Sequence, residues 1–139
     1  MTPVEVKQWL KRGIGVNAEI EQLKAAKERA EYRASSTNAG IREKMSTGKK
    51  SRNDAALAAF ADYSSRIDNK ITELQQIINE THYAINSVDN STLRMLLINR
   101  YILFMPWYEV ATKMNYSTDH VQCNLHRKAI DAVSEFIPQ

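Results

Sequence analysis

The chain has 139 residues, with 19 Lys and Arg against 16 Asp and Glu, for a formal net charge of +3. Its length supports one domain, or a small domain with a helical appendage. The single cysteine excludes an internal disulfide, and no apolar run reaches the roughly 20 residues that span a bilayer. The N-terminus also lacks the apolar core of a signal peptide. We therefore expect a cytoplasmic protein without a membrane partner.

Glycine and proline are scarce, at 4 and 3 residues, whereas Ala, Lys, Glu, Gln, Leu and Ile are abundant. This composition favours an all-α fold. The pattern along the chain predicts two regions. Residues 1–88 are expected to form an antiparallel, coiled-coil-like helical hairpin with a basic loop near residues 37–53. Residues 89–139 are expected to form a three-helix helix-turn-helix domain.

The first arm of the hairpin opens with a short helix that Thr2 caps, that starts at Pro3 and that ends at Gly13. Residues 16–34 then place apolar and small side chains at alternating spacings of four and three, among charges of both signs. This is the heptad pattern of an exposed helix that packs against a partner along one seam.

The segment 37–53 is rich in Ser, Thr, Asn, Gly and basic residues, which predicts a loop. In the simpler interpretation it is a solvated loop. In the functional interpretation its cations contact nucleic-acid phosphates, and the candidates are Lys49, Lys50 and Arg52.

A longer helix is predicted from Asn53 or Asp54 onward, because ten positions keep the heptad alternation: Leu57, Phe60, Ser64, Ile67, Ile71, Leu74, Ile78, Thr81, Ile85 and Val88. About 33 helical residues extend about 50 Å and need a packing partner. That partner is either the helix over residues 16–34 or the same helix of another subunit. Since the first arm is shorter and its seam weaker, we expect a homodimer or higher homo-oligomer through residues 71–88.

The polar run Asp89-Asn-Ser-Thr then caps a new helix, whose apolar side should pack over the helix-turn-helix pair. The expected core of this domain combines apolar and aromatic residues from all of its helices: Leu93, Leu96, Leu97, Tyr101, Trp107, Tyr116, Val121, Leu125 and Phe136.

The helix-turn-helix itself is predicted over residues 103–121. Pro106 presets the backbone of a first helix, on which Trp107, Val110, Ala111 and Met114 form one apolar stripe. Asn115 occupies the position where the turn requires a residue that tolerates positive φ. Ser117 is the expected N-cap of a second helix that starts at Thr118.

With Val121, Leu125, Ala129 and Ala132 facing the core, helical geometry turns the polar residues of the second helix outward. The candidate DNA-binding residues are Ser117, Thr118, Asp119, His120, Gln122, Cys123, His126 and Arg127. The alternative is a solvated face that docks on another protein.

No metal, cofactor or enzymatic activity is expected. His120, Cys123 and His126 suggest a metal site, but residues six apart on a helix point about 120° away from each other. The sequence also contains no acid pair, nucleophile set or glycine loop in a context that would assemble a catalytic pocket.

Four runs within this region resemble the helix-turn-helix of sigma-70 region four: Arg100-Tyr-Ile, Trp107-Tyr-Glu-Val-Ala, Met114-Asn-Tyr-Ser and His126-Arg-Lys-Ala-Ile130. Over residues 92–136 the chain resembles phage late-transcription regulators of the ArpU and RinA type. Between Ser117 and Ala129 it is one residue longer than the sigma pattern, and Asn124 replaces an apolar residue.

The resemblance implies sequence-specific binding of double-stranded DNA and activation of late phage genes in a bacterial host cell. An alternative is an interaction module that docks on RNA polymerase or a sigma factor without contacting bases. A weaker alternative is a phage packaging or structural component built on the same hairpin.

The charge distribution bears on this choice. Residues 1–52 hold 12 Lys and Arg against 6 Asp and Glu, whereas residues 107–139 hold 3 against 4. Phosphate neutralisation supplies most of the non-specific affinity for DNA, so a nearly neutral helix-turn-helix would need cations from elsewhere in the protein.

Overall fold

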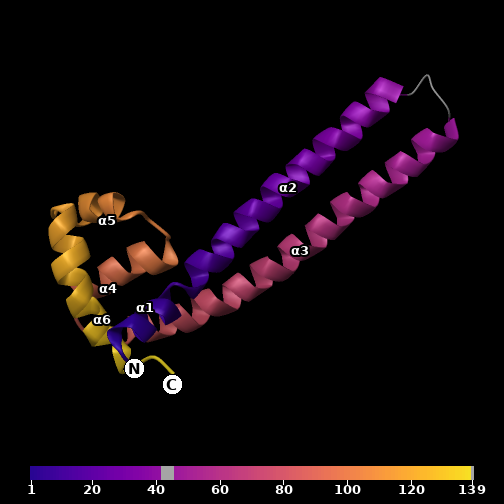
Figure 1. Ribbon diagram of the computed structural model, residues 1–139. Coiled ribbons are helices and arrows are strands. Elements are labelled where there is room, and N and C mark those ends of the chain that lie inside the picture. Colours follow the sequence, from indigo (N-terminus) through magenta and orange to yellow (C-terminus); the bar gives the residue numbers. More distant parts are fainter. Residues whose placement is uncertain (42–45, 139) are drawn as a thin grey trace. The chain divides into compact units, whose positions relative to one another are not determined.

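In the computed structural model the backbone is described for residues 1–41 and 46–138, and side chains for residues 1–33 and 54–138. All regular structure in these ranges is helical, which confirms the predicted all-α class. The elements are α1 (Pro3–Leu10), α2 (Arg12–Ile41), α3 (Ser46–Asn86), α4 (Ser91–Leu97), the π-helical turn η1 (Ile98–Ile102), α5 (Trp107–Met114), the π-helical turn η2 (His120–Leu125) and α6 (His126–Ser134) (Figure 1). Among the described residues, none of the helices combines the length and the apolar character needed to cross a membrane.

The chain divides into two compact units. The hairpin unit is Val16–Glu73, and the head unit combines Met1–Gly15 with Leu74–Gln139. The boundary expected after residue 88 therefore lies inside the head unit. Sequence periodicity does not mark the observed division, because α2 and α3 each continue without interruption from one unit into the other.

Within the hairpin unit, contacts join α2 to α3 in antiparallel order. Lys70 Nζ lies 2.7 Å from Glu19 Oε2, and Lys27 Nζ lies 4.8 Å from the ring centre of Phe60. Among the residues of this unit whose side chains are described, Val16, Ile20 and Ile67 are the buried apolar ones. On the same long helix, Ile71 and Leu57 keep 37% and 65% of their surface exposed, so the predicted stripe is only partly covered.

Helical backbone replaces both flanks of the predicted basic loop. α2 continues to Ile41, and α3 begins at Ser46 rather than at Asn53 or Asp54. Lys and Arg are good helix formers, and two isolated glycines cost only about 1 kcal/mol each, so a polar composition alone did not identify a loop. The side chains of Lys49, Lys50 and Arg52 lie outside the described residues.

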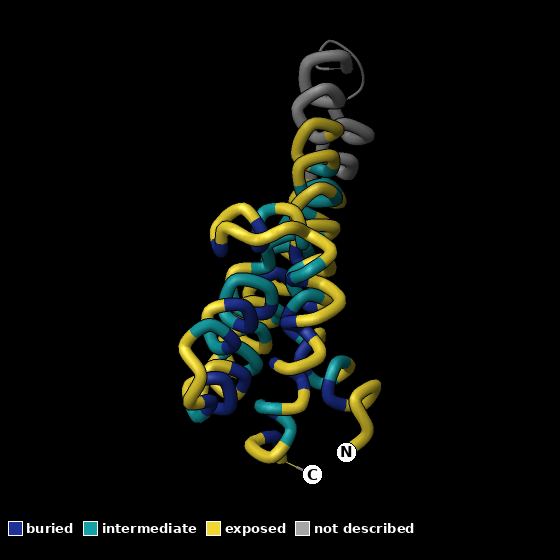
Figure 2. The backbone as a smooth tube through the Cα atoms, turned by 90° about the vertical axis from the view of Figure 1, so that its left-hand side faces the viewer, coloured by how far each residue is buried: buried dark blue, intermediate teal, exposed yellow. Residues whose placement is uncertain are grey.

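The head unit contains the main apolar core (Figure 2). α6 packs against both α1 and α4. The buried hydrophobic residues of this core are Val6, Leu10, Ala84, Ile85, Val88, Leu93, Leu96, Leu97, Tyr101, Val110, Ala111, Met114, Val121, Leu125, Ala129, Ile130, Val133 and Ile137. The end of α3 therefore contributes to this core, as does the N-terminal helix.

Six of the nine predicted core residues of this domain are buried. Tyr101 is 1% exposed, and Trp107 packs against the core while half-buried. Tyr116 and Phe136 are 47% and 38% exposed, so their prediction as core residues was wrong. Tyr116 follows the left-handed residue of the turn, which redirects the chain toward solvent, and Phe136 lies beyond the end of α6, where Ile137 takes the buried position.

Local capping follows the sequence closely. Thr2 Oγ1 accepts a hydrogen bond from Glu5 N at 3.2 Å, and α1 starts at Pro3 as predicted. Asn90 Oδ1 accepts from Thr92 N and Leu93 N at 2.9 and 3.1 Å, which starts α4 after the break at Asp89. Side-chain acceptors thus satisfy free amide groups at both helix starts.

Gly13 does not end the first helix as predicted. α1 stops at Leu10, and Gly13 lies inside α2, where a Cβ atom would stand 3.3 Å from the ring of Phe104. Phe104 itself has a φ of 58°, a left-handed conformation that non-glycine residues rarely adopt. The glycine therefore allows the segment before α5 to approach α2 closely.

A valine at position 13 should destabilise the head unit by about 1–3 kcal/mol, because its branched side chain overpacks this contact. Gly15 is the matched control, since nothing lies within 4 Å of the Cβ position there and the helix propensity changes equally. Chemical denaturation of Gly13→Val and Gly15→Val measures the difference. Equal stability of the two variants would contradict the packing role of Gly13.

Candidate nucleic-acid interface

The turn after α5 has the geometry that its sequence predicts. Asn115 adopts φ 61° and ψ 39°, the left-handed conformation expected there. Tyr116 N donates to Ala111 O at 3.1 Å, which satisfies a carbonyl group at the end of α5. Pro106 differs by one position from the expectation, because it caps the helix and Trp107 is the first helical residue.

Ser117 caps the helix that follows the turn. Its Oγ accepts a hydrogen bond from His120 N at 3.1 Å, and helical backbone begins at Thr118, as predicted. We call residues 118–134, which include η2 and α6, the second helix. Its buried residues include Val121, Leu125, Ala129 and Val133, whereas Ala132 is half-buried.

A π-helical turn interrupts the second helix at His120–Leu125, where His126 N donates to Val121 O, five residues earlier. Such a turn holds one residue more than an α-helical turn. Each helical residue rotates the chain by about 100°, so the extra residue changes which side chains face the core after Val121.

His126 is buried at 7% exposure, and its predicted outward position was wrong. Leu125 and His126 both lie on the core side, at the end of the π turn. The Nε2 atom of His126 lies 2.6 Å from the hydroxyl oxygen of Tyr101, and its ring meets the Trp107 ring edge-on at 4.6 Å between centres. This residue therefore joins three parts of the head core and is not available to DNA.

Burial determines the protonation states of His126 and Tyr101. It lowers the pKa of His126 from 6.5 to about 4, with further lowering from the positive charges of Lys7, Arg100 and Lys11. Burial also raises the pKa of Tyr101 to about 12. At neutral pH both groups are uncharged, so the hydroxyl oxygen of Tyr101 and Nε2 of His126 share one hydrogen across the 2.6 Å contact, and the tautomer of the imidazole sets which of them donates it.

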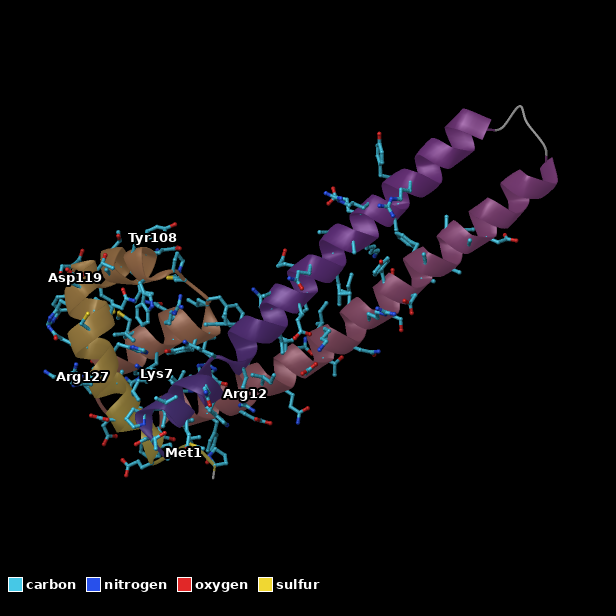
Figure 3. The ribbon with its side chains drawn as sticks, in the orientation of Figure 1. Met1, Lys7, Arg12, Tyr108, Asp119 and Arg127 are labelled. Carbon is cyan, nitrogen blue, oxygen red and sulfur yellow. The ribbon has the colours of Figure 1, made fainter. Side chains whose placement is uncertain are left out.

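The other candidate residues of the second helix and its cap lie at the surface. His120 is half-buried, with its ring centre 5.1 Å from that of Tyr116 and its Nδ1 3.2 Å from the side-chain nitrogen of Asn124. Figure 3 labels Asp119 and Arg127 on this helix. The exposed candidates are Ser117, Thr118, Asp119, Gln122, Cys123 and Arg127.

His120, Cys123 and His126 differ in their environment. Cys123 is exposed and His126 lies in the core. In the described part of the chain, no group of three or more His, Cys, Asp or Glu side chains is arranged to hold a metal ion.

Sequence analysis missed the contribution of α1 to this face. α1 packs against α6, and a hollow of about 430 Å³ lies between them, with Lys7 of α1 on its border together with Gln122, Cys123 and Arg127 of the second helix. Lys7 and Lys11 are one helical turn apart, next to the buried Val6 and Leu10. That spacing was visible in the sequence, but the packing of α1 on α6 was not.

The exposed side of the second helix offers hydroxyl, amide, thiol, carboxylate and guanidinium groups on a backbone whose opposite side is buried. Amide and guanidinium groups form paired hydrogen bonds with base edges, and hydroxyl and basic groups bind phosphate. Comparison of the chain with protein-family models, with curated protein sequences and with solved structures found no match.

Proposed function

We propose that the protein is a transcriptional regulator that binds double-stranded DNA sequence-specifically through the second helix. One observation carries the proposal: two short helices meet at the left-handed turn of Asn115, and the second of them is buried on one side and polar on the other. Helix-turn-helix proteins present the polar side of a second helix to the major groove, and a helix with these features supports the proposal.

The exposed residues of the second helix differ in the DNA groups that their side chains can bind. The side-chain amide of Gln122 can form two hydrogen bonds with adenine. The guanidinium group of Arg127 can form two with guanine or with a phosphate. Asp119 accepts a hydrogen bond from a cytosine amine but repels the backbone. Ser117 and Thr118 stand at the start of the helix, where hydroxyl groups and free amides meet phosphate.

The resemblance to phage late-transcription regulators supports a role in activating late genes inside a bacterial host. The homodimer surface was expected over residues 71–88, but Ile85 and Val88 are buried in the head core, and Ile71 is the one apolar stripe position of this range that is exposed. We keep a homodimer in the proposal through the exposed part of the α3 stripe, which includes Ile71 and Leu57. Two linked DNA-binding heads would raise the overall affinity by a large factor without new contacts at either head.

Selection from fragments of the genome that encodes the protein tests this function. The purified protein is titrated against the labelled fragments at two salt concentrations. The proposal expects retention of particular fragments at the higher salt, because base contacts resist salt better than phosphate contacts do. Absence of retention at both concentrations, with the protein folded and helical, would contradict it.

A second candidate is a module that docks on RNA polymerase or a sigma factor without contacting bases. The observation in its favour is a hollow of about 260 Å³ beside the turn, bordered by Lys113, Met95 and Tyr116. Met95 and Tyr116 are 50% and 47% exposed there. Exposed methionine and tyrosine are common where proteins meet. Binding to polymerase in the absence of any DNA affinity would favour this candidate.

A further inference from the structure

The hollow between α1 and the second helix brings together cations that are distant in the sequence. Lys7 borders it from one side, and Arg127 and Gln122 border it from the other. Its volume is about 430 Å³, which exceeds that of a single phosphate group. Asp131 also borders it, so the hollow contains one carboxylate against two cations.

These two cations are available to a ligand. Among the described residues, the ion pairs involve other basic groups: Arg12, Lys24, Arg66 and Lys70. Lys7 and Arg127 thus have no described carboxylate within 4.0 Å. An unpaired ammonium and an unpaired guanidinium that face one hollow favour an anion between them.

The electrostatics of the neighbouring core agree with this geometry. The positive charges of Lys7 and Lys11 contribute to the low pKa of His126, which also borders the hollow. α1 therefore makes the potential on this side of the second helix more positive than the composition of residues 107–139 alone would.

The position favours backbone phosphate over a base edge. Arg127, Ile130 and Asp131, which border the hollow, lie in the middle and C-terminal part of the second helix, whereas Gln122 lies nearer its N-terminal end, where base edges are contacted. In helix-turn-helix complexes the N-terminal residues of the second helix approach the base edges, and flanking residues contact the DNA backbone. Lysine binds phosphate as a flexible point charge.

We propose that a phosphate of the DNA backbone binds in this hollow between Lys7 of α1 and Arg127 of the second helix. The proposal rests on the proposed DNA-binding function and deepens it. It assigns to α1 the flanking cation that the nearly neutral helix-turn-helix lacks. α1 is then part of the DNA interface and not merely the first segment of a hairpin.

The test is DNA binding by Lys7→Gln and Lys7→Arg, measured on a selected fragment and on random DNA across a range of salt. Loss of one phosphate contact should lower affinity about five-fold at 0.15 M salt and reduce the salt slope by about 0.9. We expect equal losses on both DNAs for Lys7→Gln and nearly full retention for Lys7→Arg. Lys24→Gln removes the same charge from an exposed position in the hairpin unit and should leave binding unchanged.

The outcomes separate this site from the function on which it rests. If the wild type binds DNA and Lys7→Gln has the same affinity and slope, the phosphate site is wrong and the function stands. A loss confined to the selected fragment would also overturn it, because phosphate contacts are independent of sequence. If the wild type binds neither DNA, both proposals fail. Thermal unfolding of Lys7→Gln verifies that the variant is folded.

Discussion

The His126→Ala variant is expected to be about 2–4 kcal/mol less stable than the wild type at pH 7.5. Truncation removes packing against Trp107 and leaves the buried hydroxyl of Tyr101 without the partner that lies 2.6 Å away. A cavity and an unsatisfied buried polar group each cost about 1–3 kcal/mol or more, and the two effects overlap in part. Chemical denaturation followed by circular dichroism measures the loss.

His120→Ala is the matched control for this variant. The two histidines lie six residues apart on the same helix, but His120 is half-buried and contacts Tyr116 and Asn124 at the surface. Its replacement should cost less than about 1 kcal/mol. Comparable losses in the two variants would contradict the assignment of His126 to the core.

The stability of the head unit should also depend on the charge of His126. Its folded pKa of about 4 lies below the ordinary value of 6.5, so the unfolded chain binds the proton more readily. The contribution is therefore complete above pH 6.5 and is lost as the pH falls from 6.5 to about 4. The shift corresponds to about 3 kcal/mol.

His126→Gln isolates this effect, because glutamine keeps a hydrogen-bonding side chain that does not titrate. Between pH 7 and pH 4 the wild type should lose about 3 kcal/mol more stability than the variant, since the carboxylates titrate alike in both. Parallel pH profiles of the two proteins would show that His126 is not buried in its neutral form.

Gln122→Ala should weaken binding to a selected DNA fragment by about 1–3 kcal/mol and leave binding to random DNA unchanged. Gln122 is exposed on the second helix, and the proposed function gives it the amide contact to adenine. Competition titrations with both DNAs measure the two affinities.

Gln76→Ala provides the control for this substitution. Gln76 is an exposed glutamine of α3 within the head unit, away from the second helix in the sequence. Its replacement should change neither affinity. Equal losses on selected and random DNA from Gln122→Ala would rule out the assigned base contact.

The features that were predictable from sequence are local ones. Asn115 and Ser117 have the side chains that a left-handed turn and a helix N-cap require. Each of these two features involves only residues that are close together in the sequence. Thr2 and Asn90 act as caps for the same reason. Steric and hydrogen-bonding demands of this kind do not depend on distant parts of the chain.

The features that sequence analysis missed depend on packing between distant segments. The inward stripe expected from Val121, Leu125, Ala129 and Ala132 turns His126 outward. The buried stripe also includes Ile130 and Val133, and His126 lies with them in the core, against Tyr101 and Trp107. Lys7 belongs to the candidate interface because α1 packs on α6, a contact between chain segments more than 100 residues apart.

The loop prediction for the basic segment 37–53 failed for a different reason. Its Ser, Thr, Asn and Gly content predicted a loop over residues 37–53, yet α2 reaches Ile41 and α3 starts at Ser46. The lysines and arginines that made the segment a candidate phosphate-binding arm also favour helix. Composition alone therefore did not separate a polar helix from a polar loop.

Alkylation of Cys123 tests most directly whether the exposed side of the second helix contacts DNA. Cys123 is the only cysteine of the chain and lies exposed on this helix, so iodoacetamide labels one known position. We expect a selected DNA fragment to slow labelling of the wild type. In the control, Cys123→Ser with Ser65→Cys moves the thiol to an exposed site of α3, where labelling should not change. Equal labelling rates of Cys123 with and without saturating DNA would contradict the account.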